Sequence, residues 1–235
     1  MEKLETLWNG ITMATGSAFP LSTDSILLAD FTPLGKNCKV ADLGSGCGAL
    51  GLLLCGKDES CRVTGIELQE ASHNAALENI RRNQLSHRLS SILGDIRAIR
   101  NLLPANSFDC VVSNPPYFPQ NAGAPAKGGA RVARGEENCD LPSLFAAGAW
   151  LLRYGGIFCL VHRPERLTDL LFYARQCKLE PKRIRFVHHH ATSPISLVLL
   201  QCKLGGKPGL TFEPDLILWE KDGSPTKEQL QIYRR

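Results

Sequence analysis

The chain of 235 residues is long enough to bury one substantial hydrophobic core and somewhat short for two complete domains, so we expect one compact domain. Its 27 Lys and Arg residues against 23 Asp and Glu residues give a formal net charge of +4, which permits a nucleic-acid partner without requiring one. Nine scattered cysteines without a CxxC pair, and aliphatic runs too short to cross a bilayer, predict a reduced, cytoplasmic protein without a membrane-spanning helix.

The first predicted element is a helix within the segment PLSTDSILLADF, residues 20–31. A polar cap at Ser22, Thr23 or Asp24 precedes apolar residues at helical spacing. The side chains that we expect to face inward are Ile26, Leu27, Leu28 and Phe31. We therefore predict that residues 1–35 form an N-terminal capping segment of a single domain, 1–235, with this helix across the binding edge of a sheet.

Strand and helix signals alternate from residue 39 onward, which is typical of a parallel sheet with helices on both faces. The expected strands of the first half, with helices over 49–55 and 71–82 between them, are 39–43, 61–67, 89–95 and 108–114. A loop over 119–139, rich in Gly, Ala and Pro, separates the halves. The second half then predicts a helix over 141–153, a strand over 155–162, a helix over 165–177, strands over 183–189 and 196–202, and a tail with one more strand, a glycine turn and a polar end.

Three glycines, Gly44, Gly46 and Gly48, lie between the first strand of this sheet and the following helix. Glycine at such a position lets the backbone approach a ligand closely, so the segment VADLGSGCGAL predicts a nucleotide-type ligand. The spacing also satisfies the dinucleotide fingerprint, with Glu67 at the end of the next strand to hold ribose hydroxyls.

Two carboxylates favour a methyl donor over a dinucleotide. Asp42, two residues before Gly44, suits the ammonium and sulfonium charges of S-adenosylmethionine and would repel a pyrophosphate. Asp95, at the end of the third strand, is placed to accept a hydrogen bond from an adenine amine. The predicted cofactor-binding residues are Asp42, Gly44, Ser45, Gly46, Gly48, Glu67, Leu68, Asp95, Ile96 and Asn114.

The fourth strand ends in SNPPYF, residues 113–118. Asn114 brings a carboxamide oxygen to this end, and Pro115 holds its own carbonyl in one direction because its ring fixes φ. Two such acceptors hold both hydrogens of an NH2 group and direct its nitrogen lone pair towards a sulfonium methyl, without a metal or a strong base. The predicted catalytic residues are Asn114, Pro115, Pro116 and Tyr117.

Aromatic and basic residues around this motif are the candidates for substrate binding. Tyr117 offers a flat face to a planar substrate, and stacking on it stabilises a bound base by roughly 1–3 kcal/mol. Phe118 extends the platform, and Arg131 and Arg134 in the following loop are candidates to contact phosphate.

With the glycine loop and the NPPY motif together, the sequence resembles the amino-methyltransferases that carry Asn-Pro-Pro-Tyr. More narrowly, it resembles the bacterial tRNA(Val) adenine-37 N6-methyltransferase family, and the likeness runs over nearly the whole chain. The segments that carry it, in order, are PLSTDSILLADF, ADLGSGCGALGLLL, VVSNPPYF, Arg134 with Glu136, LVHRPERL and RIRFVHHH.

The resemblance implies a Rossmann-like methyltransferase fold with a mostly parallel seven-stranded sheet, an antiparallel final strand and helices on both faces. It also implies S-adenosylmethionine as donor, the N6 amine of an adenine in the tRNA anticodon loop as acceptor, and a part for Arg134 and Glu136 over the substrate.

The sequence is also compatible with other functions. The NPPY motif also serves in families that methylate a glutamine side chain of release factors, or other RNA and DNA bases. A noncatalytic partner module of the same fold is a further alternative, as is an NAD-linked oxidoreductase, for which we find no catalytic acid. We predict no metal site, because the adjacent residues His188, His189 and His190 on a strand point to alternate faces. The sequence does not indicate an oligomeric state.

Overall fold

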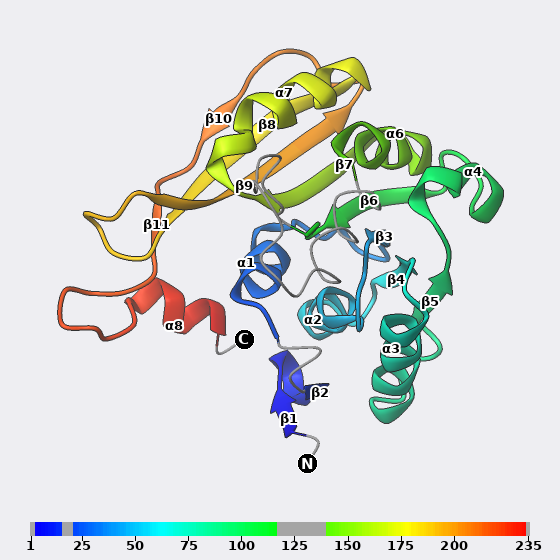
Figure 1. Ribbon diagram of the computed structural model, residues 1–235, viewed down its shortest axis with the longest axis horizontal. Coiled ribbons are helices and arrows are strands. Elements are labelled where there is room, and N and C mark those ends of the chain that lie inside the picture. The colour runs from blue at the N-terminus through cyan, green and yellow to red at the C-terminus, as the bar shows by residue number, and fades with distance from the viewer. Residues whose placement is uncertain (1–2, 16–20, 117–139, 234–235) are drawn as a thin grey trace, which may run out of the picture.

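The computed structural model describes residues 3–15, 21–116 and 140–233. The chain opens with two short antiparallel strands that pair with each other, followed by the first helix (Figure 1). These elements are β1 (Lys3–Thr6), η1 (Trp8–Gly10), β2 (Thr12–Thr15) and α1 (Thr23–Phe31). The strand pair was not predicted, because four residues are too few for an alternating pattern to stand out.

Both ends of α1 are held by side chains. Ser22 is its N-cap, and the Ser22 hydroxyl accepts a hydrogen bond from the Ser25 amide at 3.2 Å, as one of the predicted caps. At the other end the Lys57 ammonium donates to three backbone carbonyls, of Ala29, Asp30 and Thr32, at 2.9, 2.7 and 2.7 Å. The last carbonyls of a helix lack partners within it, so Lys57 both satisfies them and fixes α1 against α2.

The first half of the sheet follows the predicted alternation. Its elements are β3 (Lys39–Leu43), α2 (Ala49–Lys57), β4 (Arg62–Glu67), α3 (Glu70–Arg82), β5 (Leu89–Leu93), η2 (Ile96–Ala98), α4 (Ile99–Leu102) and β6 (Phe108–Ser113). All four strands are parallel, in the order β6, β3, β4, β5.

The second half extends the sheet on the other side of β6. Its elements are α6 (Leu141–Leu151), β7 (Leu152–His162), η3 (Pro164–Arg166), α7 (Leu167–Gln176), β8 (Leu179–His188), β9 (Ile195–Leu204), β10 (Thr211–Phe212), β11 (Leu216–Ile217) and α8 (Lys227–Tyr233). Strand β9 lies between β7 and β8 and is antiparallel to both, so the antiparallel final strand that the resemblance implied is found as β9, before the short strands β10 and β11.

The sheet has nine strands in the described part of the chain, where the resemblance implied seven, and the strand predicted in the tail is β11. The two additional strands, β10 and β11, have two residues each and pair with β8 at the edge. Helix α8 was predicted only as a polar end. Strand β7 begins at Leu152, three residues before the predicted Gly155, because the register between β6 and β7 shifts between Phe108 and Cys110 and keeps the earlier residues paired.

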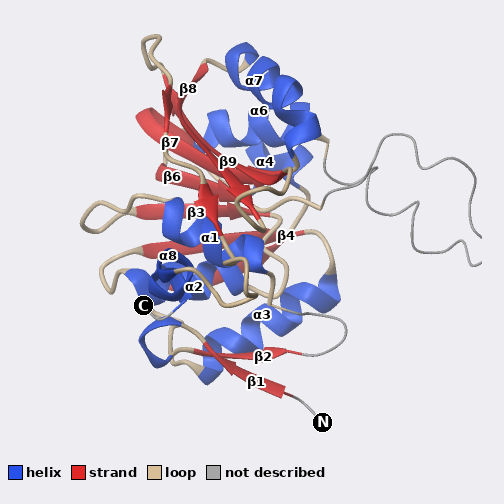
Figure 2. Ribbon diagram, turned by 90° about the vertical axis from the view of Figure 1, so that its left-hand side faces the viewer, coloured by secondary structure: helices blue, strands red, loops and turns tan. Residues whose placement is uncertain are grey.

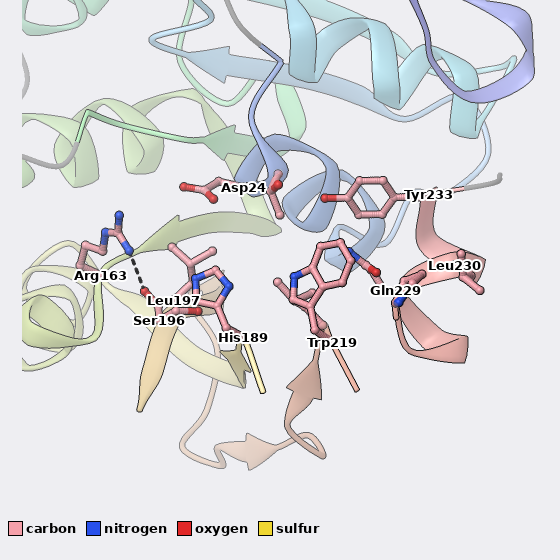
Figure 3. Close-up of a pocket in the computed structure, with 12 residues that line it drawn as sticks. Asp24, Arg163, His189, Ser196, Leu197, Trp219, Gln229, Leu230 and Tyr233 are labelled. Carbon is pink, nitrogen blue, oxygen red and sulfur yellow. Dashed lines mark hydrogen bonds between the residues drawn. The ribbon is translucent and has the colours of Figure 1, made fainter. Parts of the chain in front are cut away.

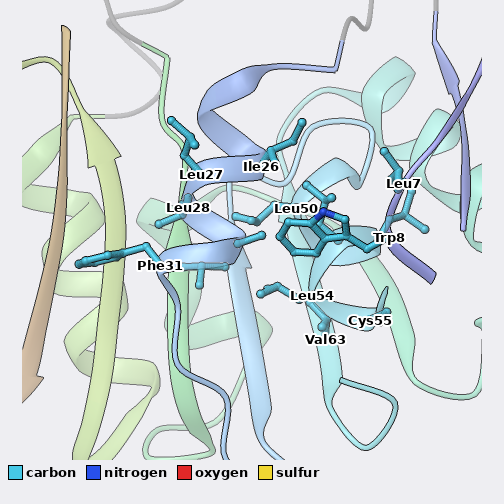
Figure 4. Packing of buried hydrophobic residues seen from close by; sticks show 14 of the residues in the cluster. Leu7, Trp8, Ile26, Leu27, Leu28, Phe31, Leu50, Leu54, Cys55 and Val63 are labelled. Carbon is cyan, nitrogen blue, oxygen red and sulfur yellow. The ribbon is translucent and has the colours of Figure 1, made fainter. Parts of the chain in front are cut away.

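Two apolar clusters cover the two faces of the sheet. Helices α1, α2 and α3 pack on one face, and α4, α6 and α7 pack on the other (Figures 1 and 2). Side chains alternate between the two faces along a strand, so in β6 Cys110 and Val112 belong to the first cluster and Val111 belongs to the second. Figure 4 shows Trp8 of the N-terminal segment within the first cluster, beside Leu50 and Leu54 of α2.

The eight cysteines of the described ranges are free thiols and seven of them are buried, as the sequence predicted for the scattered cysteines. Among the helices of these ranges, none has the length and apolar character needed to cross a bilayer.

Candidate active site

The predicted site residues gather where the direction of the chain through the sheet reverses. From β3 the chain runs to β4 and β5 on one side and then returns to β6 on the other side of β3. Strands β3 and β6 are in register at Asp42 and Val112, and the Ser113 hydroxyl donates to the Leu43 carbonyl at 2.7 Å. The segments after these two strands therefore meet at the crevice where open α/β sheets bind their ligands.

The loop after β3 has the backbone conformation that its glycines allow. Gly44, Gly46 and Gly48 have φ of 74°, 55° and 85°, a region that favours glycine. The amides of Gly44 and Ser45 both donate to the Ile66 carbonyl, at 2.9 and 3.1 Å, so the loop folds over the end of β4. A side chain at Gly44 or Gly46 would meet no described atom within 4 Å, so open space lies above the loop.

Glu67, at the end of β4, holds this loop in place. One carboxylate oxygen accepts from the Gly46 amide at 2.8 Å and the other accepts from the Gln69 amide at 2.8 Å. The side chain is buried, so both hydrogen bonds are shielded from water. Each carboxylate oxygen has a second lone pair, which leaves acceptor capacity for ligand hydroxyls.

Asp42 is a carboxyl group in an unfavourable environment. Its side chain is 1% exposed, and its Oδ2 atom has no hydrogen-bond partner among the described residues. Burial, with a smaller contribution from the charge of Glu67, raises the pKa of Asp42 to about 8. A buried acceptor without a donor costs free energy unless a ligand completes it, and a cation is the ligand that would also restore the charged form.

The second acid and the two apolar residues of the predicted cofactor site lie nearby but differ in exposure. Asp95 caps η2 by accepting from the Arg97 amide at 2.8 Å, and it forms an ion pair with the Arg97 guanidinium that helps to hold the pKa of Asp95 below its usual range. Leu68 is 38% exposed beside the loop, whereas Ile96 is buried in the core.

Asn114 lies directly after β6, and its carboxamide contacts α1. Its Nδ2 donates to the Ser25 hydroxyl at 3.0 Å and to the Ser22 hydroxyl at 3.3 Å. Two serines three residues apart share one face of a helix, so both reach the same amide. Because the amide nitrogen points at these hydroxyls, the amide oxygen points in a different direction. The sequence indicated Ser22 only as a cap, and the spacing of Ser22 and Ser25 was the signal for this second contact.

The other catalytic and substrate candidates are only partly described. Pro115 is buried and Pro116 is exposed. The predicted stacking residues Tyr117 and Phe118, and the loop residues Arg131, Arg134 and Glu136, lie outside the described residues.

His162, at the end of β7, has a local hydrogen bond. Its Nδ1 accepts from the Arg163 amide at 2.8 Å. Burial, together with the nearby charge of Arg166, lowers the pKa of His162 to about 4, so the ring is neutral at pH 7. Within the described ranges, His, Cys, Asp and Glu side chains form no group of three or more that would suit a metal ion.

Comparisons with known proteins agree with this geometry. A family model described as the methyltransferase small domain matches residues 21–167. The tRNA1(Val) (adenine(37)-N6)-methyltransferase of Porphyromonas gingivalis is 32% identical over 178 residues, covering 72% of this chain and 69% of that protein. The protein of the same name from Tolumonas auensis is 30% identical over 224 residues, covering 92% of this chain and 88% of that protein.

Solved structures show the same fold at lower identity. A predicted O-methyltransferase from Agrobacterium tumefaciens superposes with a TM-score of 0.74 at 22% identity, covering 90% of this chain and 95% of that one. Geranyl diphosphate C-methyltransferase from Streptomyces coelicolor, solved with S-adenosyl-L-homocysteine, gives a TM-score of 0.57 at 12% identity over 77% and 79% of the chains.

The glycine loop, the acids at the ends of β3 and β4, and the crevice between β3 and β6 together define a methyltransferase with a Rossmann-like fold. The sequence identity and coverage of the matches then assign the chain to a family within this class. The chain belongs to the methyltransferase small domain family and, within it, to the family of the tRNA1(Val) (adenine(37)-N6)-methyltransferases.

Proposed function

We propose that this protein transfers a methyl group from S-adenosylmethionine to the exocyclic N6 amine of an adenine in tRNA, at position 37 of tRNA(Val). The relatives that carry this name support the substrate. The observation that supports the chemistry most strongly is the Asn114 carboxamide, held by two serines of α1 at the same sheet edge as the glycine loop.

The residues at the ends of β3 and β4, and the glycine loop, fit the proposed donor. The unpartnered oxygen of Asp42 and the raised pKa of that carboxyl suit a ligand with positive charge, and the open space above Gly44 and Gly46 suits a ligand in close contact with backbone. Glu67 has acceptor capacity for ribose hydroxyls. When bound, S-adenosylmethionine supplies an electrophilic methyl group on a positively charged sulfur.

Asn114 orients the acceptor amine in this proposal. The lone pair of an adenine N6 amine is delocalised into the ring, so the amine is a poor nucleophile until its hydrogens are held out of that plane. The Asn114 oxygen accepts one hydrogen and the Pro115 carbonyl accepts the other. The Ser25 and Ser22 hydroxyls keep the amide nitrogen of Asn114 turned towards α1, and in this proposal its oxygen, on the other side of the amide, faces the substrate amine.

The proton of the methylated amine needs no strong base, because the cation formed by methyl transfer is far more acidic than the neutral amine. His162 has a pKa of about 4 and already accepts a backbone hydrogen bond, so it serves the site as a neutral structural group. The chain therefore contributes orientation and charge placement to the reaction.

The test is to identify the methylated nucleoside. The purified protein is incubated with labelled S-adenosylmethionine and a tRNA(Val) transcript, and the RNA is then digested to nucleosides. We expect N6-methyladenosine from this transcript and no label from a matched transcript with guanosine at position 37. Label in another nucleoside, or in a release-factor protein when the tRNA is not modified, would contradict the proposal.

A further inference from the structure

A cavity of about 680 Å³ lies beside α1, outside the donor and acceptor sites described above. Its lining comes from the first turn of α1, the segments after β7, β8 and β11, the start of β9, and α8. The ends of β7 and β8, and the start of the antiparallel β9, all lie at the sheet edge that carries Asn114. The cavity is therefore on the catalytic side of the molecule.

Helix α1 separates this cavity from the Asn114 carboxamide. Ser22 and Ser25 contact Asn114, whereas the two residues between them, Thr23 and Asp24, line the cavity. An α-helix with its side chains is about 10 Å across, so the cavity lies about 10 Å from the Asn114 carboxamide. Successive stacked nucleotides lie about 3.4 Å apart along one strand, so a nucleotide within about three positions of the target adenine can reach the cavity.

The side chains of the cavity combine flat rings with hydrogen-bonding groups. Figure 3 shows Asp24 and Tyr233 facing His189 and Trp219, with Arg163 at one end. Trp219 is 37% exposed, and its backbone amide donates to the His189 carbonyl at 2.8 Å, which holds the backbone that carries the ring. Tyr233 is also 37% exposed.

Two acceptors in this cavity favour a ligand with amino hydrogens. Asp24 contributes a half-buried carboxylate. Gln229 is 6% exposed, and its Oε1 atom has no hydrogen-bond donor among the described residues. Arg163, which donates to the Ser196 carbonyl at 3.1 Å, adds a positive charge at the rim. Aromatic faces, amine acceptors and a cation are the groups that proteins use for an unpaired base and its phosphate.

We infer that this cavity binds a second, unpaired nucleobase of the RNA substrate, one that carries an exocyclic amine and lies within about three nucleotides of the methylated adenine. The inference rests on the proposed function for the identity of the RNA. Trp219 stacks on the base, Asp24 accepts its amine, and Arg163 contacts the adjoining phosphate. A second anchored base fixes the register of the loop and so determines which adenine reaches Asn114.

The experiment measures RNA affinity independently of catalysis. A fluorescent stem-loop with the sequence of the tRNA(Val) anticodon arm is titrated with wild-type protein, Trp219→Ala and Trp219→Phe. The titrations are repeated with RNAs that carry one abasic nucleotide within three positions on either side of the target adenine. Tyr154→Ala is the matched control, because Tyr154 is 81% exposed near the start of β7, at the opposite edge of the sheet.

We expect Trp219→Ala to weaken binding about 10-fold or more, and Trp219→Phe and Tyr154→Ala to stay within about threefold of wild type. One abasic position should weaken binding to wild type by a similar factor and have no further effect on Trp219→Ala, because both changes remove the same contact. An unchanged S-adenosylmethionine affinity and unfolding midpoint establish that the variant is folded.

Two results would overturn the inference. One is additive effects of Trp219→Ala and the abasic nucleotide at every position, and the other is the absence of RNA binding. Coupled binding without methyl transfer would count against the proposed function and leave the second base site standing. Methyl transfer to tRNA(Val) without coupling between Trp219→Ala and any abasic nucleotide would support the proposed function and count against the second base site.

Discussion

The role that we propose for Asn114 depends on the orientation of its carboxamide as well as on the oxygen that accepts the substrate hydrogen. A free carboxamide presents nitrogen or oxygen to a ligand with little preference, since the two ends have the same size. The Ser25 and Ser22 hydroxyls, at 3.0 and 3.3 Å from Nδ2, select one orientation. In our account the serines are positioning residues, and Asn114 is the catalytic residue that touches the substrate.

We expect Ser25→Ala to reduce kcat about 10-fold, the effect of one lost hydrogen bond on an oriented group. Ser25 has the shorter contact with Asn114, and Ser22 remains to cap α1. Steady-state kinetics on tRNA should show the loss in kcat, with KM for S-adenosylmethionine within about threefold of wild type. A purely structural role would instead lower the unfolding midpoint and leave kcat of the folded fraction unchanged.

Asp42 predicts a proton release when the donor binds. Its pKa of about 8 in the free protein means that the carboxyl is mostly protonated at pH 7, and a bound cation lowers that pKa. Calorimetry at pH 7 in buffers of different ionisation enthalpy should detect close to one proton released per S-adenosylmethionine bound. The affinity should rise with pH and level off above pH 8. Equal proton release by Asp42→Asn would refute this assignment.

The same carboxyl makes the stability of the free protein depend on pH. The pKa of Asp42 is about 8 in the folded state and 3.8 in the unfolded state. Its contribution to the free energy of unfolding is therefore complete below pH 4 and is lost as the pH rises towards 8. Relative to Asp42→Asn, wild type should lose up to about 1.4 kcal/mol of unfolding free energy per pH unit in that window. Urea unfolding at pH 5.5 and pH 8 measures the difference even if the variant does not bind the donor.

At the scale of elements, the glycine loop depends on the strand beneath it. A Cβ atom at Gly65 of β4 would lie 2.6 Å from the Ser45 hydroxyl, so this strand position must be small for the loop to close down on β4. The loop is then held by the Ile66 carbonyl and the Glu67 carboxylate, which follow directly in the same strand.

We expect Gly65→Ala to lower the free energy of unfolding by about 1–3 kcal/mol, because the added methyl forces Ser45 and its loop to move. The affinity for S-adenosylmethionine should fall with it, by about 10-fold. Gly35→Ala is the matched control, since a Cβ atom there would meet nothing within 4 Å. If the two variants were equally stable and bound the donor equally well, the contact between β4 and the loop would not matter.

The sequence predicted the elements whose signals are local and long enough to repeat. The strand-turn-helix around Gly44 and the end of β6 before Asn114 each contain their own pattern, and the end of β6 was predicted to within one residue. Strand β10 has only two residues and forms because β8 offers an edge, so no local pattern predicts it, whereas β11 lies where the sequence predicted a strand in the tail. The contact between Asn114 and Ser25 joins residues 89 apart in sequence, and only the packing of α1 brings them together.

At the scale of the whole molecule, the two ends of the described chain close over the same face of the sheet. The Trp8 indole donates to the Ile232 carbonyl of α8 at 2.8 Å, across 224 residues of sequence. Helix α8 also contacts α1, which carries Ser22 and Ser25 and lines the cavity with Thr23 and Asp24. Trp8, which precedes α1 in the sequence, therefore supports α1 by way of its hydrogen bond to α8.

We expect Trp8→Phe to reduce the free energy of unfolding by about 1–3 kcal/mol, because the ring keeps most of its packing while the buried Ile232 carbonyl loses its donor. Urea denaturation measures the change. Trp219→Phe serves as the control at an exposed indole and should have an effect within about 0.5 kcal/mol. A similar loss of unfolding free energy in both variants would mean that the hydrogen bond between Trp8 and Ile232 does not stabilise the fold.

The most direct test of the central claim is the single-turnover rate of methyl transfer to tRNA(Val) by Asn114→Ala, with both substrates saturating. If the Asn114 oxygen orients the adenine amine, the rate constant should fall by about 100-fold or more, with affinities for tRNA and S-adenosylmethionine within about threefold of wild type. A rate constant within about threefold of wild type would contradict the account.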